Sequence, residues 1–233
     1  MRIQTFVLAH QEEKMLPYTM RHYTPFSEVI LLEGHSTDRT VEIAESWGAK
    51  VWNYDTNDQV DDRTFLEIKN NCWKNSDADW VIICDADEFV YSKNLIGILE
   101  NTEHTIFMPH LFNMFSDHFP TTEGQIYEEV QYGKEGGAKM NLFRPDQIKE
   151  INYGIGCHVA HPEGNVKLCI TSEIRTFHMR HLSADYVIKR NAYLNSRRSQ
   201  ENKDHGWGYH LEASPAEVRT YMKNEMTAIL KVI

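Results

Sequence analysis

Two carboxylates stand two residues apart in the run Asp85-Ala86-Asp87-Glu88, directly after the uniformly apolar stretch Trp80 to Cys84. In an extended backbone, residues two apart project to the same side, so Asp85 and Asp87 can converge on one point. Two converging carboxylates repel each other unless a cation or a hydrogen-bond donor offsets their charge. Their oxygens suit Mg²⁺ or Mn²⁺, and such an ion can hold a diphosphate and stabilise the charge that develops when it leaves. The alternative interpretation is a solvated acidic turn.

A second polar run, Glu33-Gly34-His35-Ser36-Thr37-Asp38, follows the apolar stretch Glu28 to Leu32. A carboxylate, a glycine and hydroxyls at a strand-to-helix turn suit recognition of a ribose or a base. The hydroxyls and the final carboxylate are also ordinary N-caps for a helix over Thr40 to Trp47, and we expect capping to account for part of this motif.

The elements that must position these groups alternate between strands and helices through the first hundred residues. Apolar runs predict strands over residues 3–9, 28–32, 50–54 and 80–84, and helical patterns reach Tyr23 and cover residues 40–47 and 63–74. The apolar runs lack a period of two, which favours βαβ units and a parallel sheet covered on both faces. In such a sheet, ligands bind beyond the carboxyl ends of the strands, where both polar runs fall.

The second half of the chain predicts a mixed arrangement. Residues 105–115 are apolar and aromatic, and Gly133 to Gly137 reads as a glycine-rich turn region. Short strands are predicted over residues 139–144, 167–170 and 174–178, and helices over 184–199 and 215–232. Pro215 suits the first turn of the last helix, with Ser214 as its cap. We therefore expect one α/β domain over residues 1–233, with a nucleotide-binding half (1–100) and an acceptor-binding half (101–233).

Composition and charge argue against several classes of function, among them generic nucleic-acid binding and membrane-spanning proteins. The chain has 233 residues and a formal net charge of −10, which makes it a poor generic binder of nucleic acid. No stretch approaches the ~18 apolar residues of a membrane span, and the N-terminal apolar run is too short for a signal peptide, so a cytoplasmic protein without a membrane span is expected. The four cysteines match no zinc pattern and are expected to be reduced.

The order of three segments carries a family resemblance. VLAHQEE, VILLEGHSTDRT and DADWVIICDADEF together resemble the family 2 glycosyltransferases with the GT-A fold, over about the first ninety residues. Gln11 stands in place of the usual Asn before Glu12, Glu33 in place of Asp, and His35 in place of the glycine before Ser36. Later in the chain, Lys139 to Pro145 and His178 to Ser183 are similar to a subgroup of that family.

The resemblance implies a metal-dependent transfer of a sugar from a nucleoside-diphosphate sugar, a UDP-sugar first of all, to a saccharide or glycan acceptor with inversion. It implies Mn²⁺ or Mg²⁺ as cofactor, held by Asp87 and by a late histidine, with His178 the first choice and His181 the second. The residues implied for the nucleotide-sugar are Ala9, Gln11, Glu12, Glu33, Ser36, Lys69, Asp85, Ala86, Arg180 and Lys189.

The general base is left open by the sequence. Glu88, Asp117, Glu123 and His158 are all candidates, and we place Glu88 and His158 in the catalytic group with Asp87. Aromatic residues between Phe112 and Tyr132 are expected to form an acceptor-side wall or to pack in the core.

Two other functions compete with the transferase. One is a sugar nucleotidyltransferase, although the acids of His10 to Glu13 stand where that chemistry usually has a glycine-rich basic loop. The other is an inactive nucleotide-sugar-binding module. The oligomeric state does not follow from the sequence.

Overall fold

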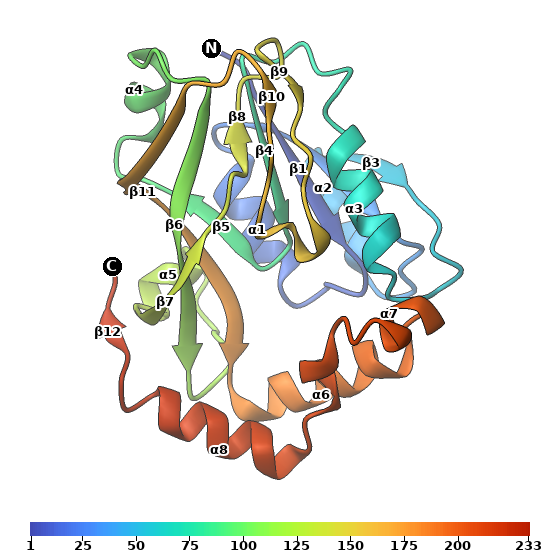
Figure 1. Cartoon of the computed structure of the whole chain (residues 1–233). Helices are drawn as coiled ribbons and strands as arrows, with labels where there is room; N and C mark the ends of the chain where they lie inside the picture. Colours follow the sequence, from blue (N-terminus) through green and yellow to red (C-terminus); the bar gives the residue numbers. More distant parts are fainter.

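The computed structural model describes all residues 1–233 and has a twisted ten-stranded sheet at its centre, with helices on both faces (Figure 1). The strands are β1 (Ile3–Ala9), β2 (Glu28–Glu33), β3 (Lys50–Asn53), β4 (Trp80–Asp85), β5 (Glu88–Tyr91), β6 (Ile106–Ser116), β7 (Tyr132–Ala138), β8 (Leu142–Phe143), β11 (Leu168–Leu182) and β12 (Leu230–Lys231), with β9 (Ile148–Glu150) and β10 (Glu163–Gly164) in a separate pair. The helices are α1 (Leu16–Tyr23), α2 (Thr40–Ser46), α3 (Asp62–Asn71), α4 (Leu95–Glu100), α5 (Ile126–Glu129), α6 (Ala184–Ser196), α7 (Gln200–Asp204) and α8 (Pro215–Glu225), with the 3-10 turns η1 (Ile155–Cys157) and η2 (Tyr209–Glu212).

The first half forms the parallel sheet that the sequence predicts. β1 lies between β2 and β4, β3 flanks β2, and all three pairings are parallel. The predicted bounds of β1 match the structure, and those of β2, β3 and β4 differ by one residue at one end. Their carboxyl ends therefore meet at one edge of the sheet. The α/β expectation is confirmed.

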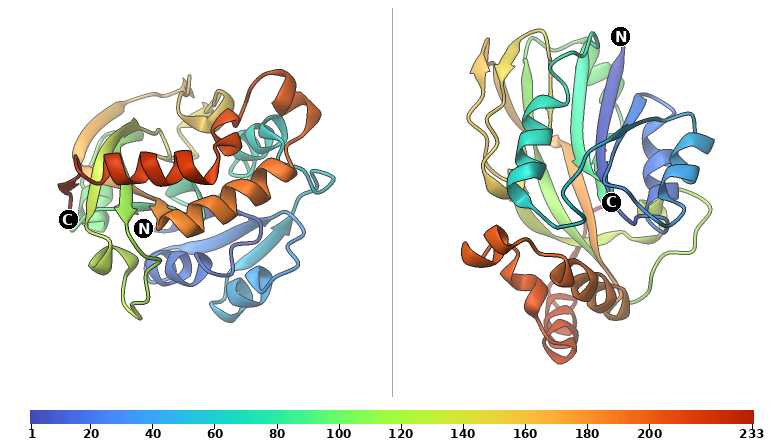
Figure 2. Two further views of the ribbon diagram at one scale, coloured as in Figure 1. Left: turned by 90° about the horizontal axis from the view of Figure 1, so that it is seen from below. Right: turned by 90° about the vertical axis from the view of Figure 1, so that its right-hand side faces the viewer.

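Both faces of this sheet are covered, because its strands are apolar on both sides. On one face, Val7 and Leu31 pack with Leu16 and Met20 of α1 and with Ala44 of α2. The other face is covered chiefly by α3 and the segment after it, whose buried anchor is the indole of Trp73. Figure 2 shows α3 on the opposite side of the sheet from α1 and α2. Burial on both faces explains the absence of alternation in the sequence.

The glycine-rich segment that the sequence assigns to a turn is instead strand β7, which pairs with β6. A Cβ at Gly136 would lie 2.4 Å from the Asn113 amide nitrogen, and one at Gly133 would lie 2.9 Å from the Asn113 carbonyl oxygen. The glycines thus permit a close approach of the two strands, a use of glycine that resembles a turn signal in the sequence.

Three further expectations for the second half need correction. The two strands predicted at 167–170 and 174–178 are one strand, β11, whose pairing with β6 shifts register between Thr171 and Arg175. Of the strand predicted at 139–144, only Leu142 and Phe143 are paired. The last helix has the predicted Ser214 cap and Pro215 start, but it ends at Glu225, and β12 follows and pairs with β7.

Helices α6, α7 and α8 lie across the end of the molecule where the parallel strands finish (Figures 1 and 2). Helix α6 is capped by Ser183, whose hydroxyl accepts the Tyr186 N–H at 3.2 Å. Its end is fastened to the loop before α3, because the Val60 N–H donates to the Arg197 carbonyl and the Ser199 N–H donates to the Val60 carbonyl. The C-terminal segment therefore covers the edge of the sheet at which the parallel strands end.

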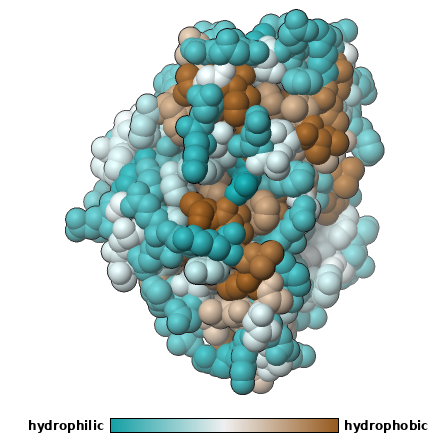
Figure 3. Space-filling view, turned by 90° about the vertical axis from the view of Figure 1, so that its left-hand side faces the viewer, coloured by the Kyte–Doolittle hydropathy of each residue, from teal (hydrophilic) through white to brown (hydrophobic).

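The side of the molecule where β11 and β12 lie is shown in Figure 3, where separate apolar patches interrupt a mostly hydrophilic surface. Such scattered exposure is ordinary for a protein surface. All four cysteines are free. None of the helices combines the length and the apolar composition that crossing a bilayer requires.

One buried histidine makes the stability of this fold dependent on pH. His22 of α1 bonds the Val90 carbonyl through Nε2 at 3.0 Å, and burial lowers its pKa to about 4. The unfolded chain, with a pKa of about 6.5, therefore takes up the proton first as the pH falls, and stability is lost from about pH 6.5 towards pH 4.

We expect this group alone to cost about 2 kcal/mol of unfolding free energy between pH 7.5 and pH 5. Urea unfolding of the wild type and of His22→Gln at both pH values measures it. The variant should lose that part of the pH dependence. An equal change in unfolding free energy between the two pH values for both proteins would contradict the prediction.

Candidate active site

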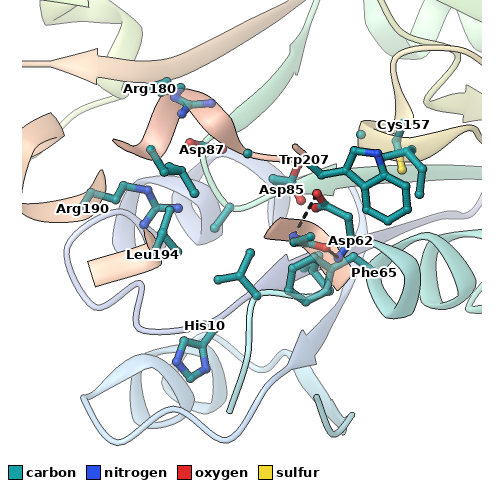
Figure 4. Close-up of a pocket in the computed structure, with 18 of the residues that line it drawn as sticks. His10, Asp62, Phe65, Asp85, Asp87, Cys157, Arg180, Arg190, Leu194 and Trp207 are labelled. Atoms are coloured by element: carbon teal, nitrogen blue, oxygen red, sulfur yellow. Dashed lines mark hydrogen bonds between the residues drawn. The ribbon is translucent and has the colours of Figure 1, made fainter. Parts of the chain in front are cut away.

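A cavity of about 500 Å³ lies at the carboxyl edge of the parallel strands. Its floor is made by the ends of β1 and β4, and its walls come from α3, η1, α6 and the segment from α7 to η2 (Figure 4). The acidic run after β4 lies in this floor, where the sheet topology predicts it.

Asp85, the last residue of β4, is paired with a lysine. Lys69 of α3 is buried, and its Nζ lies 2.6 Å from Asp85 Oδ1. Burial alone would raise the pKa of Asp85, but the Lys69 and Lys139 ammonium groups outweigh burial and the pKa is lowered. Lys69 and Asp85 both line the cavity. The Lys69 ammonium group offsets much of the negative charge of the Asp85 carboxylate.

Glu88 lies behind the two aspartates and supports their turn. It is 1% exposed, and its carboxylate pairs with the buried Lys139 ammonium. The other oxygen, Oε2, accepts the Asp85 N–H at 3.3 Å. The Glu88 carboxylate therefore holds the backbone of the turn Asp85-Ala86-Asp87 through this hydrogen bond, and its own charge is offset by Lys139.

Asp87 points into the cavity beside a histidine. Its Oδ2 lies 3.5 Å from His178 Nε2, while His178 Nδ1 lies 3.2 Å from Asn113 Oδ1, which fixes the ring. Burial would raise the pKa of Asp87, but His178, Arg190 and Arg180 together outweigh it and lower the pKa.

Arg180 follows two residues after His178 on β11 and lies next to Asp87 at the cavity wall (Figure 4). It makes no ion pair and no hydrogen bond, and burial lowers its pKa. This guanidinium is the cation of the site that has no partner, and it therefore suits an anionic ligand.

Glu12 forms a third compensated pair. Its Oε1 lies 2.5 Å from Arg190 Nη2 of α6, and its backbone N–H donates to Thr40 Oγ1 at 2.7 Å. Burial raises the pKa of Glu12 to about 7, against the opposing effect of Arg190. The pair joins the loop after β1 to α6 across the cavity wall.

The polar groups of the turn after β2 form hydrogen bonds within the turn and with the loop after β1. Glu33 accepts the His35 and Ser36 N–H groups at 2.8 and 2.6 Å, and Ser36 Oγ accepts the Gln11 N–H at 2.9 Å. The side chain of Gln11 in turn bonds Thr37 and Asp38. Glu33, Ser36 and Gln11 therefore hold two loops together and do not line the cavity, although Gly34 does. Their predicted role at the nucleotide stays a prediction.

The remaining predicted residues fall in different places. Ala9 and Ala86 line the floor, and His158 lies in the wall beside η1. Lys189 is exposed and faces a second cavity, of about 400 Å³, on the other side of α6. His181 lies outside both cavities and stacks on Phe115, with ring centroids 4.6 Å apart.

Two base candidates and much of the expected aromatic wall also lie elsewhere. Asp117 pairs with the exposed His118 at 2.6 Å, and neither Asp117 nor Glu123 lines the cavity. Phe112, Phe119 and Tyr127 pack in a core cluster with Phe177, which is the second of the two roles expected for this segment.

Sequence reasoning did not single out several cavity residues. Asp62 and Phe65 of α3 and Asn202 of α7 line it, and no local pattern marks them. Trp207 lines it too; the glycines on either side of it predict a mobile loop that orders over the donor, and that role stays a prediction.

The residues present were tested for their fit to a divalent metal. No cluster of three or more His, Cys, Asp or Glu side chains is arranged around one point. Asp87 and His178 supply an oxygen and a nitrogen donor, and Mg²⁺ or Mn²⁺ commonly takes one or two protein ligands and completes its shell with phosphate oxygens and water. The pair thus fits a metal that arrives with a phosphorylated ligand.

Comparison with known proteins gives one family match. The family model described as glycosyl transferase family 2 matches residues 5–163. No curated protein matches the chain.

Several solved structures are similar in part. Glucosyl-3-phosphoglycerate synthase from Mycobacterium tuberculosis, in complex with Mn²⁺, UDP and glucosyl-3-phosphoglycerate, is 19% identical over 48% of this chain and 44% of that chain, with a TM-score of 0.35. S. aureus TarS is 13% identical over 84% of this chain and 39% of that chain, with a TM-score of 0.49. TarS 1-349 in complex with UDP-GlcNAc is 10% identical over 84% and 66%, with a TM-score of 0.45. The chain thus spans less than half the length of the first two.

The Lys139–Glu88 pair gives a test of how the acidic turn is held. Lys139→Met leaves the Glu88 carboxylate buried without a charge partner, and we expect a loss of about 3–5 kcal/mol in unfolding free energy by urea titration. The double variant Lys139→Met/Glu88→Gln should recover part of that loss, which a double-mutant cycle measures. Lys134→Met, which removes an exposed lysine, is the control and should change little. A single variant as stable as the control would show that Glu88 needs no cation.

Proposed function

Since the chain belongs to glycosyl transferase family 2, we propose that it is a metal-dependent transferase that moves a sugar from a UDP-sugar to a hydroxyl group of a saccharide or glycan, with inversion. That it is a glycosyltransferase follows from the family. The donor nucleotide, the metal, the acceptor class and the stereochemistry are the proposal, together with a cytoplasmic location.

The observation that carries the proposal is the distribution of charge in the cavity. Glu12, Asp85 and Glu88 each have a Lys or Arg in contact. Asp87 has only His178, and the neighbouring Arg180 has no partner. A metal ion with a diphosphate matches these two groups. The ion can bind the Asp87 carboxylate, and the phosphate oxygens can accept hydrogen bonds from the Arg180 guanidinium.

In this proposal Asp87 and His178 would hold the metal, which would supply positive charge for the departing diphosphate. Arg180 supports the same charge from the β11 side. Asp85 and Lys69 act together as a neutral pair on the floor, where they can meet the ribose or the sugar. Glu88 and Lys139 keep the turn in place beneath them.

Inversion requires one displacement at the anomeric carbon. The acceptor oxygen forms its bond to that carbon as the bond to the β-phosphate oxygen breaks, and the acceptor proton passes to a base. Of the four base candidates, His158 alone lines the cavity without an ion pair, since Glu88 is paired with Lys139 and the two others lie outside. Partial burial and the Lys139 ammonium lower the pKa of His158, which keeps its ring neutral at pH 7 and able to accept a proton. We therefore propose His158 as the base.

The donor site is tested by calorimetry of UDP with and without Mn²⁺. Wild type should bind UDP in a metal-dependent manner, and Asp87→Ala should weaken that binding about tenfold or more while leaving the metal-free binding nearly unchanged. Asp77→Ala, which removes an exposed aspartate paired with Arg2, is the control.

UDP binding that ignores both Mn²⁺ and Asp87 would overturn the metal role and leave a cation-assisted transferase. Failure to bind UDP, GDP or dTDP under any of these conditions would remove the donor site itself. His158→Gln should keep the wild-type UDP affinity, because the base acts on the acceptor.

A further inference from the structure

The two ends of the cavity differ in chemistry. At one end lie Asp87, Arg180 and Arg190, and at the other lie the rings of Phe65 and Trp207 on either side of Asp62 (Figure 4). A nucleoside diphosphate has the same polarity, with a charged group at one end and a flat ring at the other. If the diphosphate occupies the Asp87 end, the base falls at the aromatic end.

Asp62 is held in this aromatic end by an amide. The Asp62 N–H donates to Asn202 Oδ1 at 3.1 Å, and Asn202 Nδ2 donates back to Asp62 Oδ2 at 3.2 Å. Asn202 is fully buried, so this reciprocal pair is rigid. The second carboxylate oxygen, Oδ1, has no hydrogen-bond partner, and the carboxylate lies in the cavity (Figure 4).

Asn202 also holds the backbone at one of the two aromatic residues. Its backbone carbonyl accepts the backbone N–H of Trp207 at 2.8 Å, and the Trp207 indole stacks on His205 with ring centroids 4.6 Å apart. On the other side, Phe65 packs edge-on against Tyr54, with centroids 6.1 Å apart. One buried residue thus holds both the carboxylate of Asp62 and the backbone of Trp207.

Helix capping does not explain the carboxylate of Asp62. The preceding residue, Asp61, is the N-cap of α3, and its Oδ1 accepts the Arg63 and Thr64 N–H groups at 3.0 and 3.2 Å. Asp62 is therefore free of the capping duty that acids at this position often serve.

We propose that Asp62 selects the base of the donor nucleotide, its free carboxylate oxygen accepting the N3–H of a uracil that packs between Phe65 and Trp207. The inference rests on the proposed donor site and deepens it. Uracil presents a ring N–H at that position, whereas cytosine presents a lone pair, which a carboxylate repels. A site built to accept an N–H rejects the analogue that lacks it, because the buried acceptor is then left unpaired.

The matched ligands UDP and CDP test this proposal, because they differ only at this edge of the pyrimidine. Calorimetry with Mn²⁺ should show wild type binding UDP at least about tenfold more tightly than CDP. Asp62→Asn replaces the acceptor by an amide that can donate to cytosine N3, so UDP should weaken about tenfold and CDP should strengthen, which closes or reverses the ratio. Glu67→Gln makes the same chemical change on an exposed position of α3 and should leave the ratio at the wild-type value.

A purely structural role for Asp62 would lower the thermal stability of Asp62→Asn and leave the UDP:CDP ratio unchanged, and that result overturns the proposal. Equal binding of UDP and CDP by the wild type overturns it as well. In both cases, metal-dependent UDP binding that is lost in Asp87→Ala leaves the proposed function intact. A wild type that binds neither nucleotide removes the donor site, and the inference with it.

Discussion

The gathering of four carboxylates at one edge of the sheet, three of them buried, is the constraint on which the site depends. Glu12, Asp87 and Glu88 are buried, and Asp85 is half-buried in the cavity floor. An unpaired carboxylate in such surroundings costs several kcal/mol, so each requires a cation or must give up its charge. The cations come from segments far apart in the chain: Lys69 from α3, Lys139 after β7, and Arg190 from α6. The parallel half supplies the acids and Lys69, and the later half supplies the cations for Glu12 and Glu88.

This charge balance sorts the cavity residues by role. A carboxylate in contact with a Lys or Arg is a fixed part of the cavity wall. A ligand that bound the carboxylate in place of this cation would leave the cation without a partner. Asp87 differs because its neighbour is an imidazole, which is a weaker counter-charge and also a metal ligand. Arg180 is the complement on the cationic side. The site therefore has one position for a cation and one for an anion, side by side, next to three carboxylates (Glu12, Asp85 and Glu88) that each have a Lys or Arg in contact.

The sequence predicted the parallel half closely because its signals are local. Strands buried on both faces appear as unbroken apolar runs, and β1 was placed without error. The second half depends on contacts between distant segments. The glycines of β7 look like a turn until Asn113 of β6 is seen beside them, and β12 forms only because β7 offers an edge. The positions of Asp85, Asp87 and His178 followed from strand ends and family spacing. By contrast, the bridge between Asp62 and Asn202, 140 residues apart, leaves no trace in any local pattern.

The same charge balance bears on how the acceptor is activated. Carboxylates commonly serve as the base in sugar transfer with inversion, but here Glu88 is neutralised by Lys139, and Asp117 bonds an exposed histidine outside the cavity. Freeing Glu88 for catalysis would leave Lys139 buried without a partner and would remove the acceptor that holds the Asp85 N–H, so it could act only by loosening the turn that positions Asp87. An imidazole avoids this conflict, because it is neutral before it takes the proton and requires no permanent counter-charge. His158, in the wall beside Lys139, satisfies that requirement without disturbing any pair beneath the acidic turn.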